Sequence, residues 1–144
     1  MVKPKLNLQK FMRGTVWLVG TGPGDPGLIT LYTLHAIRQA DVIIYDALVN
    51  SEILKMAKKK AKLVFAGKRG GKPSFKQKDI SNRIVGYAKK KLRVLRLKSG
   101  DPFVFGRGAE EALKLIKEKI PFRIVPGITA GIGGIAYAGI PATY

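Results

Sequence analysis

Hydrophobic residues follow two alternating spacings along the chain. Short, mainly apolar runs, which are typical of buried strands, occur at residues 15–19, 42–45, 63–66, 94–97 and 122–125. Between them, apolar residues at helical spacing predict helices over residues 28–39, 51–59, 79–90 and 109–119 and a last helix near Thr129. Ser51 is a residue type that favours a helix N-cap, so we expect it to begin the second helix.

The order of these elements predicts an α/β fold. Apolar strands that are separated by helices are typical of a parallel sheet that is buried on both faces. We therefore expect a five-stranded, mostly parallel sheet with helices on both faces. Right-handed crossovers then bring every strand-to-helix loop to one edge of the sheet, where ligands of such folds bind.

The loops that follow the five strands contain the residues best suited to a ligand site. Three loops are rich in glycine, which lets the backbone approach a ligand closely, and they lie at residues 20–27, 99–108 and 126–131. Asp46 follows the second strand, and Lys68 and Arg69 follow the third. Any one of these loops could be an ordinary turn. Five such loops on one edge predict a binding site.

Two common phosphate-binding motifs are absent from the sequence. The first glycine-rich loop has Asp25 where a dinucleotide-binding fingerprint has its third glycine, and Pro23 removes a backbone donor. The chain also has no phosphate loop of the G-x-x-x-x-G-K-[ST] type. Glycine backbone together with one acid, Asp101, suits a neutral or cationic adenosyl ligand better than a pyrophosphate.

The composition narrows the class of protein. A length of 144 residues predicts one domain, and a hydrophobic share of 46% excludes a disordered tail. The absence of cysteine and the single histidine exclude disulfides, cysteine-ligated zinc and histidine-rich metal sites, and suit a reducing cytoplasm. Residues 124–144 are uncharged and long enough to span a bilayer, but five glycines and two prolines favour a buried loop and helix instead.

The net charge of +18 is concentrated in one window. Residues 55–98 contain seventeen Lys or Arg and one acid, Asp79, so this window contributes +16. Two interpretations remain open. The window is either a solvated, highly charged surface, or it attracts a polyanion such as a nucleic acid or a small molecule with several carboxylates.

Five motifs occur in one order along the chain: VGTGPGDPGLIT, YDALV, GKRGG, RLKSGDPFVFGRGAEE and VPGITAG. With these motifs, residues 14–141 resemble the amino-terminal half of the uroporphyrinogen-III C-methyltransferases, a group within the tetrapyrrole methylases. We therefore divide the chain into a basic N-terminal extension, residues 1–13, and a tetrapyrrole methylase N-terminal domain, residues 14–144. The resemblance implies that a second α/β domain, which supplies much of the adenosine pocket, is missing.

The resemblance also implies roles for individual residues. Those that match the S-adenosylmethionine site are Pro23, Ser99, Gly100, Asp101, Val104, Thr129 and Ala130, with Ser99 in place of the usual glycine. Asp46 matches a proposed proton acceptor and Lys68 a proposed proton donor. Arg107 and Glu110 match a motif that faces the tetrapyrrole, and we expect Arg69 to bind its carboxylates as well.

Each of these charged residues has a structural alternative. Asp46 could cap a turn. Lys68 and Arg69 could be ordinary solvated charges. Arg107 could form an ion pair with Glu110 or with Glu111.

The function implied by the resemblance is methylation of uroporphyrinogen III at C2 and C7 with S-adenosylmethionine. The products are S-adenosylhomocysteine and precorrin-2, the precursor of sirohaem and cobalamin. It also implies a cytoplasmic homodimer for the full-length enzyme, a tetrapyrrole as the partner molecule, and no membrane or nucleic-acid partner. Because half of the enzyme is missing, we expect little activity from the chain alone. The alternatives are a ribosomal-RNA methyltransferase of the same fold and a non-enzymatic basic binding module.

Overall fold

Five parallel strands form the centre of the molecule. The computed structural model describes residues 7–67 and 77–143. The strands are β1 (Val16–Gly20), β2 (Val42–Tyr45), β3 (Lys62–Phe65), β4 (Val94–Lys98) and β5 (Phe122–Val125), in the sheet order β3-β2-β4-β1-β5. Every pairing between neighbouring strands is parallel, which confirms the predicted sheet and places all strand-to-helix loops at its carboxyl edge.

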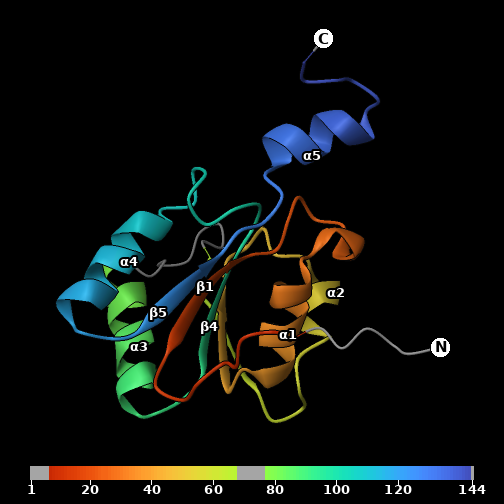
Figure 1. The fold of residues 1–144 in the computed structure, drawn as a ribbon. Coiled ribbons are helices and arrows are strands. Elements are labelled where there is room, and N and C mark those ends of the chain that lie inside the picture. The colour runs from red at the N-terminus through yellow and green to blue at the C-terminus, as the bar shows by residue number, and fades with distance from the viewer. Residues whose placement is uncertain (1–6, 68–76, 144) are drawn as a thin grey trace.

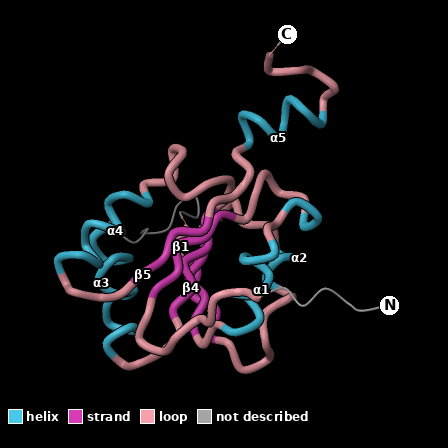
Figure 2. Tube along the Cα trace, in the orientation of Figure 1, coloured by secondary structure: helices cyan, strands magenta, loops and turns pink. Residues whose placement is uncertain are grey.

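Helices cover both faces of this sheet, as Figures 1 and 2 show. The helical elements are a short 3-10 turn, η1 (Pro26–Leu28), and the helices α1 (Leu31–Gln39), α2 (Ser51–Leu54), α3 (Gln77–Lys89), α4 (Gly108–Lys117) and α5 (Ala130–Tyr137). Residues of α1 and α2 belong to one hydrophobic cluster, and residues of α3 and α4 belong to the other. The prediction of helices on both faces is therefore confirmed.

The cluster under α1 and α2 also includes a residue that precedes β1. Trp17 of β1 packs with Ala36 and Ile37 of α1, and Phe11 stacks on the Trp17 ring with centroids 4.7 Å apart. Phe11 is 2% exposed, and its carbonyl accepts a hydrogen bond from Arg93 Nε at 2.8 Å. Part of the predicted N-terminal extension thus packs against the domain.

Two predicted helices differ from those observed. The first helix begins at Leu31 rather than at residue 28, because Thr30 is its N-cap and accepts from the amide of Thr33. The second helix spans only Ser51–Leu54, and its N-cap is Asn50, so the prediction of Ser51 as the cap was wrong. Asn50 is the N-cap because its side chain makes two hydrogen bonds: it accepts from the amide of Glu52 and donates to the carbonyl of Gly24.

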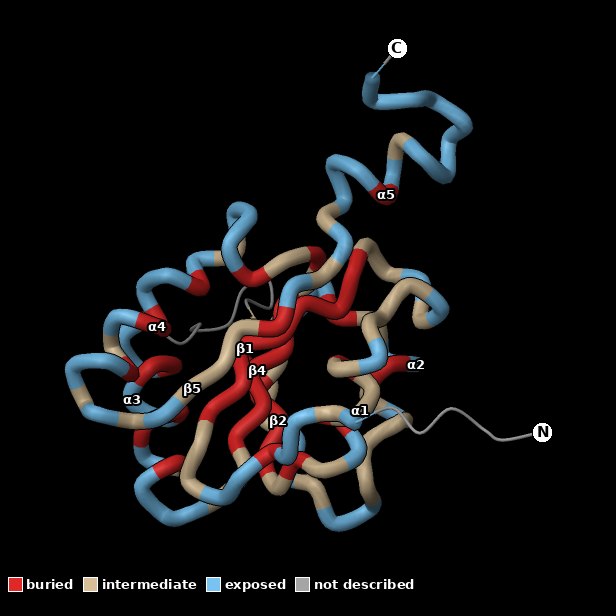
Figure 3. The backbone as a smooth tube through the Cα atoms, in the orientation of Figure 1, coloured by how far each residue is buried: buried red, intermediate tan, exposed pale blue. Residues whose placement is uncertain are grey.

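The last helix, α5, stands beyond the carboxyl edge of the sheet and is largely exposed (Figure 3). Two contacts join it to the loop after β1. The Tyr137 hydroxyl donates to Asp25 Oδ2 at 2.8 Å, and Gly133 lies against Pro23, whose Cγ is 2.9 Å from the position that a Cβ would occupy. Residues 124–143 of the uncharged stretch are divided between β5, a loop, α5 and the residues after it, and the expectation that the loop and helix would be buried was wrong, because most of these residues are exposed. No helix in the described part of the chain could cross a membrane.

Candidate functional site

The carboxyl edge of the sheet is hollowed by a cavity of about 1020 Å³. Loops after β2, β3, β4 and β5 line it, together with the start of α5. Seven residues predicted for the site are among those that line it: Asp46, Ser99, Gly100, Val104, Arg107, Thr129 and Ala130. The parallel sheet, which brings its strand-to-helix loops to one edge, therefore places together residues that are more than 80 positions apart in the sequence.

Four glycines at or just after the ends of β1, β4 and β5 pack backbone against backbone behind this cavity. Gly100 and Gly22 exchange two backbone hydrogen bonds, of 2.7 and 3.2 Å, and both have positive φ, +65° and +73°. A Cβ on Gly127 would lie 2.2 Å from the Gly100 carbonyl oxygen, and a Cβ on Gly20 would lie 2.4 Å from the same atom. Only glycine allows these loops to meet so closely.

Three predicted site residues lie beside the cavity rather than in its lining. Pro23 packs under α5, as described above. Asp101 accepts from the amide of Phe103 at 2.8 Å and from the amide of Gly127 at 3.0 Å, so its carboxylate joins the loop after β4 to the loop after β5. Glu110 faces Arg107 on the first turn of α4.

Arg107 and Glu110 form a two-pronged ion pair at the rim of the cavity. Arg107 Nε and Nη2 donate to the two oxygens of Glu110 at 2.6 and 2.8 Å, so of the two partners considered from the sequence it pairs with Glu110. This hydrogen bonding raises the pKa of Arg107 and lowers the pKa of Glu110. Both side chains are more than half exposed, at 59% and 51%, so the pair is accessible from solvent.

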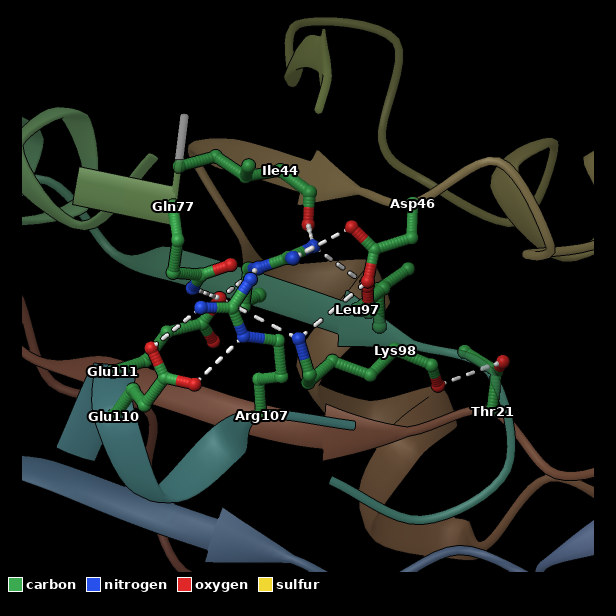
Figure 4. Close-up of polar contacts among 10 residues, drawn as sticks. Thr21, Ile44, Asp46, Gln77, Leu97, Lys98, Arg107, Glu110 and Glu111 are labelled. Carbon is green, nitrogen blue, oxygen red and sulfur yellow. Dashed lines mark hydrogen bonds and ion pairs between the residues drawn. The ribbon is translucent and has the colours of Figure 1, made fainter. Parts of the chain in front are cut away.

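The floor of the cavity holds a buried ionic cluster that consists of Asp46, Arg96, Lys98 and Glu111. Figure 4 labels Asp46, Lys98 and Glu111 of this cluster. Arg96 bridges the two acids, since Nη2 is 2.6 Å from Asp46 Oδ1 and Nε is 3.0 Å from Glu111 Oε1. Lys98 also lies between them, with Nζ 3.5 Å from Asp46 Oδ2 and 3.4 Å from Glu111 Oε1. Two cations and two anions thus balance one another.

The members of this cluster differ sharply in burial. The side chains of Arg96, Lys98 and Glu111 are 1%, 4% and 0% exposed, whereas Asp46 is 30% exposed and opens to the cavity. Burial would lower the pKa of Arg96, but the charges of Glu111 and Asp46 outweigh it and raise that pKa above its ordinary value. Asp46 is therefore a carboxylate that faces the cavity and is held in place by two buried cations.

Sequence reasoning missed Arg96, Lys98 and Glu111. The first two lie in β4, whose apolar character comes from the alternate residues Leu95 and Leu97 on the opposite face. A signal was present, because cations at every second position of a central strand require buried acids. The predicted Lys68 and Arg69 lie outside the described residues, and within the described residues no group of three acidic, histidine or cysteine side chains could hold a metal ion.

Relatives of this chain share its sequence over most of its length. A family model described as Tetrapyrrole (Corrin/Porphyrin) Methylases matches residues 15–144. A uroporphyrinogen-III C-methyltransferase of Sinorhizobium sp is 69% identical over 132 residues, which are 92% of this chain and 47% of that protein. A siroheme synthase of Actinobacillus pleuropneumoniae is 54% identical over 144 residues, 100% of this chain and 30% of that protein. The chain thus spans about half the length of these relatives, or less.

Solved structures agree with the sequence matches. A crystal structure of uroporphyrin-III C-methyltransferase from Thermus thermophilus matches with a TM-score of 0.81 and 42% identity, covering 92% of this chain and 56% of that one. A second structure from Thermus thermophilus, complexed with S-adenosylhomocysteine, matches with a TM-score of 0.76 and 39% identity, covering 90% and 53%. These matches confirm the resemblance in the five motifs. The chain belongs to the tetrapyrrole methylases.

Proposed function

We propose that this chain is the amino-terminal part of an S-adenosylmethionine-dependent methyltransferase that acts on uroporphyrinogen III at C2 and C7 and gives precorrin-2. The names of the Sinorhizobium and Thermus thermophilus relatives support the reaction class and the substrate. The observation in this chain that supports it most is Asp46, a partly exposed carboxylate that faces the cavity between two buried cations.

The chemistry requires a residue of this kind. S-adenosylmethionine supplies an electrophilic methyl group, so the protein has to align the reactants rather than activate a nucleophile. When a ring carbon of the macrocycle gains a methyl group, a proton has to leave the macrocycle, and Asp46 is the acceptor in this proposal. Lys68 is the proposed donor of a proton elsewhere on the ring.

The residues around the cavity fit an adenosyl ligand. The glycine contacts among Gly20, Gly100 and Gly127 keep side chains away from the backbone at the back of the cavity. We propose that the cofactor is held by Ser99, Gly100, Val104, Thr129 and Ala130, which line the cavity, and by Pro23 and Asp101 beside it. The S-adenosylhomocysteine bound in the Thermus thermophilus structure supports this class of ligand.

The substrate side of the cavity is proposed to bind carboxylates through arginine side chains. Uroporphyrinogen carries several carboxylates, and Arg107, with its exposed partner Glu110, lies at the rim where a carboxylate would approach. Arg69 is proposed to contribute a second guanidinium. A homodimer and a cytoplasmic location for the full-length enzyme are part of the same proposal, as is little turnover by this chain alone.

Titration of S-adenosylhomocysteine into the folded chain tests the cofactor site. We expect micromolar binding by calorimetry, and we expect Ala130→Phe to weaken it about tenfold or more, because the new ring fills the cavity. Ala138→Phe is the matched control, since Ala138 is an exposed residue that follows α5 and does not line the cavity.

If the folded chain does not bind, the titration is repeated on the chain lengthened by the C-terminal half of the Sinorhizobium relative. Binding there supports a site shared between two domains. Absence of binding there, in a folded protein, contradicts the proposed function and leaves the non-enzymatic basic module as the better account.

A further inference from the structure

Glu111 is a buried acid that cannot itself reach a ligand in the cavity. Its side chain is 0% exposed, and it is not among the residues that line the cavity. It lies on the inward face of α4 beside Ala112 and Leu115, which are part of the apolar layer under α3 and α4. A charge in this position is costly unless its neighbours compensate it.

The polar contacts that compensate the buried charge of Glu111 are unevenly divided between its two carboxylate oxygens. Oε1 accepts from Arg96 Nε at 3.0 Å, from Gln77 Nε2 at 3.0 Å and from Lys98 Nζ at 3.4 Å. Oε2 is buried and has no partner among the described residues. Within the described residues, the acid is therefore held by the two cations and by Gln77 of α3, and no hydrogen bond from α4 holds its side chain.

The same two cations make the contacts of Asp46. Arg96 Nη2 lies 2.6 Å from Asp46 Oδ1, whereas Lys98 Nζ is 3.5 Å from Oδ2. Arg96 and Lys98 are thus shared between an acid that faces the cavity and an acid that does not. Among the described residues, Oδ2 has only the long contact to Lys98, so it is the oxygen of Asp46 that is more open to a proton.

We propose that Glu111 is a positioning residue that sets how strongly Asp46 binds a proton, by drawing part of the charge of Arg96 and Lys98 away from it. The geometry supports the coupling without reference to any reaction. Its consequence for catalysis rests on the proposed function, in which Asp46 accepts the proton. In the described part of the chain, the other charged groups at the cavity near the cluster are Arg107 and Glu110 at the start of α4, which pair with each other.

Glu111→Gln tests this proposal, because it removes the charge and keeps the shape of the side chain. Both cations then act on Asp46 alone, so its carboxyl should titrate about one pH unit lower than in the parent chain. Lys98→Met should shift the midpoint in the opposite direction, and the double variant should return it toward the parent value. The measurement is the pH dependence of the Asp46 carboxyl carbon signal by NMR, assigned by its loss in Asp46→Asn.

Glu118→Gln is the matched control. It removes the same charge near the opposite end of α4, where Glu118 pairs with Lys89 and Lys114, and it should leave the Asp46 midpoint unchanged. If Glu111→Gln does not fold, Lys98→Met is compared with the double variant. These two differ only in the charge of Glu111, so the Asp46 midpoint should again be lower when that charge is absent.

An unchanged Asp46 midpoint on loss of the Glu111 charge would overturn the inference, even if the variant were less stable, since a purely structural acid would not move it. The proposed function fails separately, if Asp46→Asn in the lengthened enzyme retains the parent turnover of uroporphyrinogen III.

Discussion

The tightest steric constraint at the residue scale is the contact of Gly127 with Gly100. A Cβ on Gly127 would lie 2.2 Å from a backbone oxygen, which cannot move without shifting β4. We expect Gly127→Ala to lower the free energy of unfolding by about 1–3 kcal/mol, as overpacking does in well-packed interiors. Urea unfolding followed by circular dichroism measures this loss.

Gly134→Ala is the control for that substitution. Gly134 lies within α5, and no atom is within 4 Å of the position of its Cβ. Alanine is a better helix former than glycine, so this variant should be neutral or slightly more stable. Equal losses for the two variants would mean that the contact between the loops does not restrict position 127.

Residues at the sheet edge could be predicted from the sequence, whereas the partners of the buried cations could not. Asp46 and Thr129 follow strands, and topology alone brings such positions to one edge. Arg96 finds its partner Glu111 fifteen positions away on another element. No local spacing indicates such a pair, because it depends on how α4 packs on β4.

At the element scale, α5 depends on a hydrogen bond that works only within a range of pH. The bond from Tyr137 holds the pKa of Asp25 below its ordinary value of 3.8, and the same bond raises the pKa of Tyr137 above 10.0. The carboxylate has to be ionised and the phenol protonated. The bond therefore contributes above pH 3.8 and is lost as the pH falls through the pKa of folded Asp25, and it is also lost as the pH rises through the pKa of folded Tyr137.

We expect Tyr137→Phe to release α5 from the loop after β1. Amide hydrogen exchange in α5 should become faster at neutral pH, and the amide signals of the parent should show the same release when the pH is lowered below 3.8. Tyr87→Phe is the control, because Tyr87 lies in α3 on the other side of the molecule. Unchanged exchange in Tyr137→Phe would show that packing alone holds the helix.

Element boundaries show where sequence patterns stop being informative. The prediction for β2, residues 42–45, is confirmed at both ends, because an apolar run and its flanking polar residues decide it. The helix predicted over 51–59 ends at Leu54, since Lys58 turns back to pair with Asp41 at 2.6 Å. A tertiary contact decides where this helix ends, and the spacing of apolar residues along the chain gives no information about that contact.

At the scale of the whole molecule, the net charge of +18 predicts binding to polyanions. Exposed lysines such as Lys59, Lys60 and Lys90 lie away from the cavity lining. We expect a single-stranded RNA to bind without sequence preference and to lose affinity about tenfold or more between 50 and 200 mM salt, because counterions are released. Fluorescence anisotropy measures this dependence.

Binding of S-adenosylhomocysteine is the control in the same salt series. Its affinity should change little, because the molecule is not a polyanion. Sequence-selective RNA binding that survives high salt would instead favour the ribosomal-RNA methyltransferase alternative.

The sheet order has a consequence for synthesis of the chain. β1 and β2 are made first, but they are not neighbours, because β4 lies between them. A ribosome must therefore release residues 94–98 before the first two strands can share one sheet. The same strand brings Arg96 and Lys98, so a nascent chain that ends before it has Asp46 without these two cations beside it. β4 thus joins β1 to β2 and brings both cations to Asp46 in one step, whereas the ionic cluster is completed later, when α4 brings Glu111.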